Sequence, residues 1–517
     1  MKTIFRSLCA FSAAVLLMAG CCNNSSKWVS GEYSWPYKVE NGTIVTKIPE
    51  RPAGQESALG LTAPKVPVVR VGFVGIRGRG AGAIERWTYI DGTRIVALCD
   101  YEQEVAERRQ NILKEASLPP AVLYWGPEGY KELCERDDID LVYIATDWKH
   151  HFPIAKYALE HGKHVVSEVP AALTLDEIWQ LIDLAESRRL HCMMLENCCY
   201  DFFELNSLNM AQHGVFGEII RVEGAYIHNL TGLWGHYWKE DPSSVMDWRI
   251  DYNQKHRGDV YPTHGLGPVA QVLNIHRGDR MKTLVAMDTK AVNGPAWVAE
   301  QTGKPCEDFK NGQNTTTLIR TENDKVIEIQ HEVTTPRPYN RLYQLDGTKG
   351  FANKYPVSFY AMEKDQYESL GLKSDKSFGH DDFLPAEERA ALEAKYRHPI
   401  VTKYEEVAKR VGGHGGMDFI MDCRLVYCLQ HGLPLDMDVY DLAEWCCLGE
   451  LGAMSMDKGC LPVAVPDFTR GNWNVKNGFS HAYASPEEEV AVEKASAEFM
   501  AALKEEGKAY WASHSER

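Results

Sequence analysis

The stretch "VPVVRVGFVGIRGRG", residues 66–80, constrains the fold of this chain more than any other. Its first half is an unbroken apolar, β-branched run, which is typical of a strand buried in a parallel sheet. Gly75, Gly78 and Gly80 then lead into a helical pattern. A strand that turns through glycines into a helix can bring backbone N–H groups against a pyrophosphate. We therefore expect a dinucleotide-binding turn, although Arg77 replaces the usual second glycine of the fingerprint.

Strand and helix patterns alternate through the next 120 or so residues. Strands are predicted at 93–100, 138–146, 163–169 and 190–197, and helices at 82–90, 102–116, 151–162 and 174–189. Thr174 and Glu177 are spaced as the two members of a helix capping box. Such alternation predicts an α/β fold with a doubly wound parallel sheet, a Rossmann domain.

Polar residues stand where these predicted strands end. They are Asp100, Trp148, Lys149, His150, His151, Glu168 and Asn197. The carboxyl ends of parallel strands line the ligand crevice, so we expect contacts with a cofactor or substrate. Asp100 closes the second strand, where an acid binds both ribose hydroxyls of NAD and repels the extra phosphate of NADP. Adjacent histidines rarely chelate one ion, and no metal site is predicted.

From about residue 200 the pattern changes to closely spaced strands. They are predicted at 218–227, 282–289, 314–322, 325–334 and 340–350, before helices at 417–432 and 439–456. This order predicts a second α/β domain with a largely antiparallel, open sheet. We place the Rossmann domain at 67–198, the second domain at 199–470 and a tail at 471–517. Residues 21–66 are expected to form a tether and an N-terminal extension.

The N-terminus has the pattern of an export signal. Lys2 and Arg6 precede the apolar run "LCAFSAAVLLMAG", which is too short for a stable membrane anchor. Small residues before Cys21 resemble a bacterial lipoprotein cleavage box, with residues 1–20 as the signal peptide and Cys21 lipidated. The alternative is an ordinary secretory signal. We expect an exported lipoprotein, facing the periplasm or at the cell surface, attached to the membrane only through its lipid.

Net charge and cysteine content further limit the possible partners of the protein and the chemical state of its cysteines. The net charge of −16 argues against nucleic acid as a partner, because such binders need a basic face. Eleven cysteines follow the leader, an odd number with no CxxC pair, and most lie in apolar stretches. We interpret most of them as buried thiols.

The segment "YPTHGLGPVAQ", residues 261–271, has the features of a proton-transfer motif. One helical turn would bring Tyr261 and His264 onto the same side, and both can exchange protons. Gly265 and Gly267 would let the backbone pass close to another segment. A histidine before a helix is more often structural than catalytic, but the cofactor domain upstream favours the catalytic interpretation.

These features together resemble the glucose–fructose oxidoreductase/inositol dehydrogenase (Gfo/Idh/MocA) superfamily, and within it glycoside hydrolase family 109, whose known activity is α-N-acetylgalactosaminidase. The matching segments run in order over about residues 68–470. They include "VSEVPAALTLDEIWQLID", "HCMMLENCCY", "GVFGEIIRVEGAYIH", "YPTHGLGPVAQ", "TTPRPYNRLYQLDGTKG", "HGGMDFIMDCRLV", "GLPLDMDVYDLAEW" and "VPDFT". The segment 231–248 is lengthened relative to this pattern.

The resemblance implies NAD as cofactor, a small glycoside or glycan as substrate, and a set of contacts. NAD contacts fall on the glycine turn with Gly75, Gly78 and Arg79, and on Asp100, Trp148, Lys149, His150, His151, Glu168, Val169 and Asn197. Sugar contacts fall on Tyr226, Arg249, Tyr261, Pro262, Thr263, His264 and Tyr339. His264, assisted by Tyr261 or Tyr226, is the expected proton-transfer group. The superfamily's second sheet often pairs two copies, so a homo-oligomer is possible.

The implied chemistry is redox-neutral. Hydride leaves C3 of the sugar for NAD, a base takes the C2 proton, the C1 group is eliminated, water adds, and the hydride returns. Dehydrogenases of this superfamily usually have a lysine where this chain has Val169, and valine cannot move a proton. This difference favours the glycosidase. An NAD-dependent sugar or inositol dehydrogenase and a non-catalytic sugar-binding protein remain the alternatives.

Overall fold

The first sheet of the computed structural model, which describes residues 27–379 and 381–514, is the predicted Rossmann sheet. Its six strands are all parallel, in the order β5-β4-β3-β6-β7-β8. They are β3 (Val69–Val74), β4 (Thr93–Asp100), β5 (Val122–Trp125), β6 (Leu141–Ile144), β7 (His164–Ser167) and β8 (Cys192–Met194). The order reverses between β3 and β6, which opens a crevice at their carboxyl ends.

Five helices connect these strands. They are α2 (Gly78–Trp87), α3 (Gln103–Glu115), α4 (Gly129–Cys134), α5 (Trp148–Glu160) and α6 (Leu175–Arg188). The capping box at α6 is present: Thr174 Oγ1 accepts from the Glu177 N–H, and the Glu177 side chain accepts from the Thr174 N–H. The sequence analysis missed β5 and α4, because the apolar run of β5, "VLYW", has only four residues and α4 has only six.

The second sheet has ten strands, in the order β1-β2-β16-β10-β11-β12-β9-β13-β14-β15. Their bounds are β1 (Tyr37–Glu40), β2 (Thr43–Thr46), β9 (Ile219–Ile227), β10 (Met281–Asp288), β11 (Thr315–Thr321), β12 (Val326–Glu332), β13 (Asn340–Gly347), β14 (Phe351–Asn353), β15 (Phe359–Ala361) and β16 (Val463–Ala464). Most pairs are antiparallel, as predicted, but β9 pairs with β12 and β2 with β16 in parallel. Burial alternates along β11, so one face is covered and the other is open.

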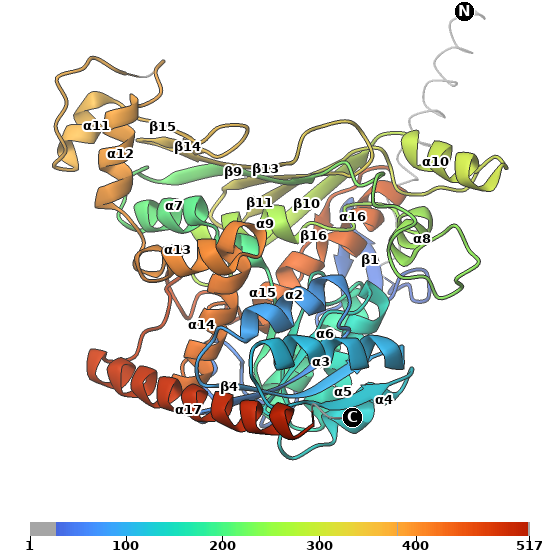
Figure 1. Ribbon diagram of the computed structural model, residues 1–517. Coiled ribbons are helices and arrows are strands. Elements are labelled where there is room, and N and C mark those ends of the chain that lie inside the picture. The colour runs from blue at the N-terminus through green and yellow to red at the C-terminus, as the bar shows by residue number, and fades with distance from the viewer. Residues whose placement is uncertain (1–26, 380, 515–517) are drawn as a thin grey trace, which may run out of the picture.

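Helices fill the space between the two sheets (Figure 1). The helices that follow β8 in the chain are η2 (Asn197–Tyr200), α7 (Phe202–Gln212), α8 (Trp248–Lys255), α9 (Thr263–Val272), α10 (Asn293–Thr302), α11 (Lys364–Ser369), α12 (Ala386–Lys395), α13 (Pro399–Val411), η3 (His414–Gly416), α14 (Met417–His431), α15 (Val439–Cys446), α16 (Leu448–Asp457) and α17 (Pro486–Ser513). None of the described helices is long and apolar enough to cross a membrane.

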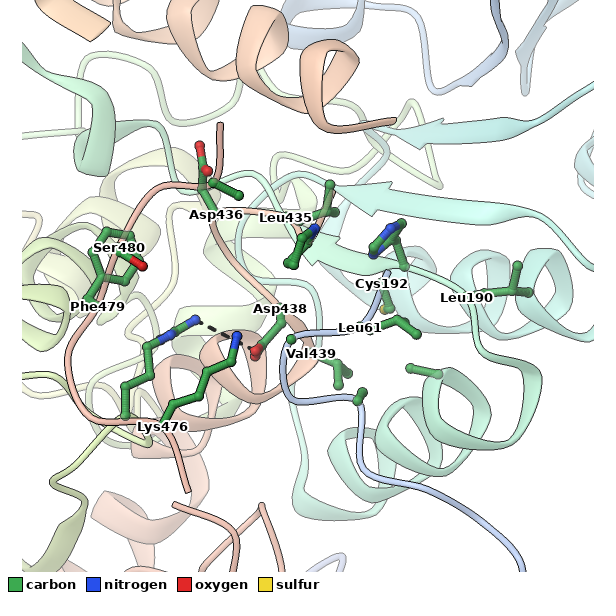
Figure 2. A pocket seen from close by; sticks show the side chains of 17 residues that line it. Leu61, Leu190, Cys192, Leu435, Asp436, Asp438, Val439, Lys476, Phe479 and Ser480 are labelled. Carbon is green, nitrogen blue, oxygen red and sulfur yellow. Dashed lines mark ion pairs between the residues drawn. The ribbon is translucent and has the colours of Figure 1, made fainter. Parts of the chain in front are cut away.

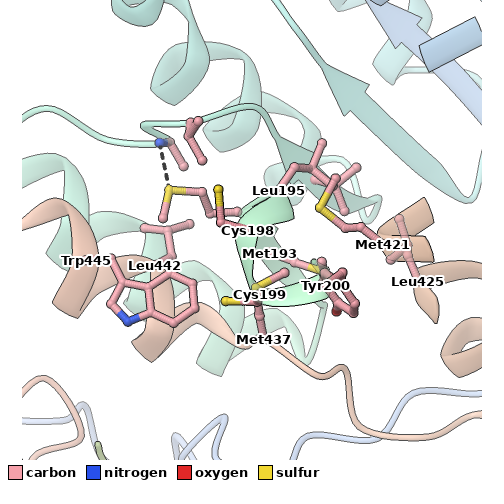
Figure 3. Close-up of a cluster of buried hydrophobic side chains, with 14 of the residues drawn as sticks. Met193, Leu195, Cys198, Cys199, Tyr200, Met421, Leu425, Met437, Leu442 and Trp445 are labelled. Carbon is pink, nitrogen blue, oxygen red and sulfur yellow. Dashed lines mark hydrogen bonds between the residues drawn. The ribbon is translucent and has the colours of Figure 1, made fainter. Parts of the chain in front are cut away.

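The core of α14 and α15 continues into the Rossmann domain. Every residue of α14 is buried. Figure 3 shows Met421 of α14 and Trp445 of α15 in one apolar cluster with Met193, Leu195 and Cys199. Nine of the eleven described cysteines are buried and all are free, which confirms the interpretation as buried thiols. This shared core fixes the second domain against the carboxyl end of β8.

The N-terminal extension and the tail are more ordered than the sequence analysis expected. Residues 37–46 form a hairpin that joins the second sheet through β2 and β16, so this part is not a tether. The tail contains α17, which lies along the Rossmann domain (Figure 1). Its Trp511 Nε1 donates to the Leu118 carbonyl oxygen at 2.7 Å. The predicted signal peptide, residues 1–20, and the predicted lipidation site Cys21 lie outside the described residues.

Candidate active site

The turn between β3 and α2 has room for a pyrophosphate. Gly75 has a φ of +81°, and a Cβ there would lie 2.6 Å from the Thr146 backbone nitrogen. A Cβ on Gly80 would lie 2.0 Å from the Gly75 carbonyl oxygen. A Cβ on Gly78 would meet nothing within 4 Å, so the space before the helix N-terminus is open. The first turn of α2 has no acidic residue and no side-chain cap, which leaves its N–H groups for an anion.

Asp100 is fixed at the end of β4 and is 4% exposed. Its carboxylate accepts hydrogen bonds from the backbone N–H groups of Ile76 and Glu102, both at 3.2 Å. The Arg77 guanidinium contacts Asp100 at 3.1 Å and Glu102 at 2.8 Å, which gives the residue in the second-glycine position a structural role. The carboxylate therefore lies at the end of β4, where a Rossmann fold binds the adenosine ribose of its dinucleotide.

Replacing Asp100 with alanine is expected to weaken NAD binding by about tenfold to a hundredfold, the range for lost hydrogen bonds to a charged group. NADP binding should fall less, or rise, because the repulsion of its extra phosphate is removed. Calorimetric titration of both dinucleotides checks this. Glu102→Gln is the matched control, since it shares Arg77 but its side chain is 48% exposed. An unchanged NAD-to-NADP affinity ratio in Asp100→Ala would contradict the assignment.

The residues after β6 form the first turn of α5 rather than the loop that the sequence suggested. Trp148 stacks on Tyr261 of the second domain, with ring centroids 5.4 Å apart. Lys149 pairs with Glu240 of the lengthened segment at 2.6 Å, and His150 pairs with Asp147. His151 is buried between the carbonyl oxygens of Pro170 and Thr146. Trp148 thus packs on Tyr261, a predicted sugar contact, and His151 holds two backbone carbonyl groups in place.

Glu168 and Asn197 are linked at the carboxyl edge of the sheet by a chain of contacts through Arg79 and Asp418 of α14. Arg79 donates to Glu168 Oε1 at 2.9 Å and to Asp418 Oδ2 at 3.0 Å. Asn197 Nδ2 donates to Asp418 Oδ1 at 2.5 Å. Val169 is buried among apolar residues and offers no proton-transfer group. The structure therefore links three of the cofactor residues predicted from the sequence, Arg79, Glu168 and Asn197.

Tyr226 and Tyr261 of the second domain reach the carboxyl edge of the Rossmann sheet because α9 lies directly on β9. Gly224 and Gly265 face each other there: a Cβ on Gly265 would lie 2.4 Å from the Ala225 nitrogen. This close approach brings the Tyr226 ring to 4.6 Å from Tyr261 and 5.4 Å from His264, between centroids. The predicted close passage at Gly265 is confirmed, and its partner is β9.

His264 lies between a carboxylate and a phenol. Its Nδ1 is 2.7 Å from Glu196 Oε1, and its Nε2 is 3.3 Å from the Tyr261 hydroxyl. Burial opposes the charge of Glu196, but the charge and hydrogen bonds of His264 outweigh it and keep the pKa of the carboxyl below its ordinary value. Burial raises the pKa of Tyr261 well above its ordinary value, so the phenol keeps its proton. The one-turn spacing of Tyr261 and His264 thus gives a hydrogen-bonded pair.

Arg249 presents a buried guanidinium to the same space. Asp247 caps α8 by accepting from the Arg249 and Ile250 N–H groups, both at 3.0 Å, which places Arg249 in the first turn. Its guanidinium carbon lies 5.0 Å from the Trp148 ring centroid and 5.1 Å from that of Tyr261. Its Nη2 has no hydrogen-bond partner in the described part of the chain. A sugar oxygen would satisfy it.

The remaining predicted sugar residues border this space. Tyr339, 40% exposed, packs edge-on against His228 and Tyr226, with centroids 5.1 Å and 6.5 Å away. Pro262 and Thr263 begin α9 and hold the backbone between Tyr261 and His264. Thr263 is fully buried, so its role is to place the helix start.

Sequence reasoning missed Glu196, Asp418 and His414. Glu196 stands directly before Asn197, and a strand-end acid was a usable signal. His414 lies on a loop of four glycines with positive φ, from Gly412 to Gly416, and its side chain is 53% exposed. Its Nδ1 is 3.0 Å from Asp418 Oδ2 and from Arg79 Nη1. His414 thus places a second imidazole beside Arg79, one of the predicted NAD contacts.

Two further features are a group of possible metal ligands and a cavity. Donor atoms of Glu196, Cys198 and His264 lie within 4.8 Å of one another, but Glu196 and His264 are already hydrogen-bonded to each other. A cavity of about 90 Å³ lies at the start of β8, among Cys192, Asp438 and Lys476 (Figure 2). None of the predicted site residues lines this cavity.

The fold and site define a two-domain protein whose first domain is a Rossmann domain of the kind that binds NAD. Residues 69–196 match the oxidoreductase family described as an NAD-binding Rossmann fold, so NAD is the cofactor. Residues 200–475 match the C-terminal domain of glycosyl hydrolase 109. The chain belongs to glycoside hydrolase family 109, as the sequence motifs predicted.

Relatives cover the whole chain. Glycosyl hydrolase family 109 protein 5 of Phocaeicola vulgatus is 62% identical and aligns over 100% of this chain and 99% of its own length. Family 109 protein 1 of Bacteroides thetaiotaomicron is 60% identical over 86% of this chain and 94% of its own. Levoglucosan dehydrogenase in complex with NADH and L-sorbose has the same fold, with a TM-score of 0.55 and 18% identity, covering 78% of this chain and 100% of that one.

Proposed function

We propose that this glycoside hydrolase cleaves α-N-acetylgalactosaminides by an oxidation, elimination, hydration and reduction cycle that consumes no net NAD. The observation that carries the proposal is the line of hydrogen bonds from Glu196 through His264 to Tyr261. When bound, NAD supplies a reversible hydride acceptor beside the sugar. The chain itself must then supply a base, a proton donor and groups that orient the sugar.

His264 is suited to remove a proton. Because Glu196 accepts from Nδ1, the proton of the neutral imidazole is held on that nitrogen. Nε2 is then left with a lone pair toward Tyr261 and the sugar space. Tyr261 can pass a proton between the sugar hydroxyl and Nε2, since its buried phenol stays protonated. Arg249 holds a sugar oxygen and stabilises negative charge on it.

The acids of the site are each already engaged. Glu196 is bound to His264, Glu168 to Arg79, and Asp418 to Arg79 and Asn197. Ordinary glycosidases need one free carboxylate as nucleophile or base and another as proton donor. The three carboxylates here are committed to positioning other groups, which supports a route that needs no carboxylate pair.

An aryl glycoside panel tests the proposal on the purified full-length protein. Aryl α-N-acetylgalactosaminide should release its phenol with no net rise in absorbance at the NADH wavelength. In heavy water the product should carry deuterium at C2, since that proton is removed and replaced. A chelator should leave the rate unchanged, because no step needs a metal. If the protein cleaved other aryl glycosides but not the aryl α-N-acetylgalactosaminide, the N-acetylgalactosamine assignment would be refuted.

The alternative is an NAD-dependent sugar or inositol dehydrogenase on the same fold. It would accumulate NADH with a free sugar and excess NAD, and it would leave the aryl glycosides intact. The buried Val169 weighs against it, because the position after Glu168 cannot relay a proton.

A further inference from the structure

Asp418 joins the two domains at the cofactor edge. It is fully buried near the start of α14, and its two oxygens face four side chains. Oδ1 accepts from Asn197, while Oδ2 faces Arg79 and His414 at 3.0 Å and Arg86 at 3.5 Å. Asn197, Arg79 and Arg86 belong to the Rossmann half of the chain. One carboxylate of the second domain therefore organises several groups of the first.

Two of these groups come from opposite ends of the Rossmann domain's sequence and converge on the Asp418 carboxylate. Arg79 follows Gly78 at the N-terminus of α2, where the pyrophosphate space is open. Asn197 begins η2, which follows β8, the last strand of the Rossmann sheet. Arg79 is shared between Glu168 and Asp418, so its guanidinium is fixed from two directions. A carboxylate only accepts hydrogen bonds, so Asp418 also fixes which end of the Asn197 amide faces it.

We propose that Asp418 is a positioning residue for NAD, which holds Arg79 and Asn197 in place from the second domain and makes cofactor affinity depend on α14. The proposal takes Arg79 and Asn197 as NAD contacts, as the family resemblance implies, and does not depend on the proposed glycosidase activity. Asp418 acts through them and does not touch the reacting atoms. Burial opposes its charge, but the hydrogen bond of His414 and the charges of Arg79 and Arg86 keep its pKa well below the ordinary value.

The test is the NAD affinity of Asp418→Asn in the full-length protein. NAD is removed by dialysis and titrated back by calorimetry, without any glycoside present. We expect the dissociation constant to rise about tenfold to a hundredfold, because hydrogen bonds to a charged group are lost. Glycosidase activity should recover at saturating NAD, with KM for the glycoside nearly unchanged.

Asp422→Asn is the matched control. Asp422 lies one turn further along α14, is equally buried, and bonds to Arg86 at 2.8 Å without contacting Arg79 or Asn197. It should lower the melting temperature and leave NAD affinity unchanged. Wild-type NAD affinity in Asp418→Asn, or equal weakening in Asp422→Asn, would overturn the proposal and reduce Asp418 to a structural role.

Asp418→Glu protects the test against a folding failure. It keeps the charge but moves the carboxylate by one methylene, so stability should recover while NAD affinity stays below that of the wild type. If Asp418→Glu recovered both wild-type stability and wild-type NAD affinity, the negative charge alone would be sufficient and its position would not matter. That result would contradict the proposal. Because NAD binding is read without glycoside, a wild-type protein that binds NAD but cleaves nothing refutes the proposed function and leaves this inference standing.

Discussion

Glu196→Gln is expected to lower kcat for aryl α-N-acetylgalactosaminide by about 10²–10⁴-fold, the usual contribution of a positioned acid–base group. The glutamine amide can donate to Nδ1 of His264 as well as accept from it. When it donates, the imidazole proton moves to Nε2, and the lone pair that faces Tyr261 is lost. Glu196 is a positioning residue here, because it acts on the sugar only through His264.

His264→Ala should cause a loss of at least the same size, and the double variant should be little worse than either single one, because the two residues act as a unit. Rates, NAD affinity and C2 deuterium exchange are measured together. The pH profile of kcat should also change shape in Glu196→Gln, which a purely structural role would not produce. Bound NAD should be retained in both variants.

His414→Ala is the comparison that decides between the two imidazoles. If C2 exchange persists in His264→Ala but disappears in His414→Ala, proton removal belongs to His414, and our assignment of His264 is wrong. If His414→Ala keeps the exchange but slows phenol release, His414 serves the leaving group instead. Its glycine loop and exposed side chain make the second role sterically accessible.

Local patterns predicted much of the fold because the residues concerned act locally. The run ending in Gly75 predicts a buried strand, and the turn to α2 follows from the glycines beside it. The pairing of Tyr261 with His264 needs only one helical turn. Strand β5 was missed because its apolar run of four residues is too short to indicate a strand by itself. Helix α17 was missed because most of its residues are exposed: only Ser496, Met500, Leu503 and Gly507 are buried, and two of these are not apolar side chains.

The missed site residues act across long sequence separations. Asp418 lies 221 residues from Asn197, and nothing in "HGGMD" shows that its carboxylate reaches back to the first domain. Glu196 could be recognised as an acid at a strand end. Its partner His264 lies on α9, and the contact between them depends on how α9 packs near the end of β8. Such contacts follow from tertiary packing, which no local period records.

Gly265→Ala is expected to destabilise the protein by about 1–3 kcal/mol, the usual cost of overpacking a filled interface. The added Cβ would lie 2.4 Å from the Ala225 nitrogen, and backbone of a central strand cannot move aside like a side-chain tip. Alanine gains about 1 kcal/mol of helix propensity over glycine, which offsets only part of this cost. Urea unfolding gives the free energy of unfolding.

The same substitution should also impair catalysis beyond its effect on stability. Helix α9 must move away from β9, and a displacement of about 1 Å can cost about 10²-fold in rate. Gly452→Ala is the matched control: it also lies in a helix, α16, packed on this sheet, but its added Cβ would lie 3.5 Å from Ala286 Cβ, an ordinary contact. That variant should be as stable as the wild type or more so, with full activity. If Gly265→Ala behaves like Gly452→Ala, the close approach of α9 to β9 does not set the Tyr226, Tyr261 and His264 geometry.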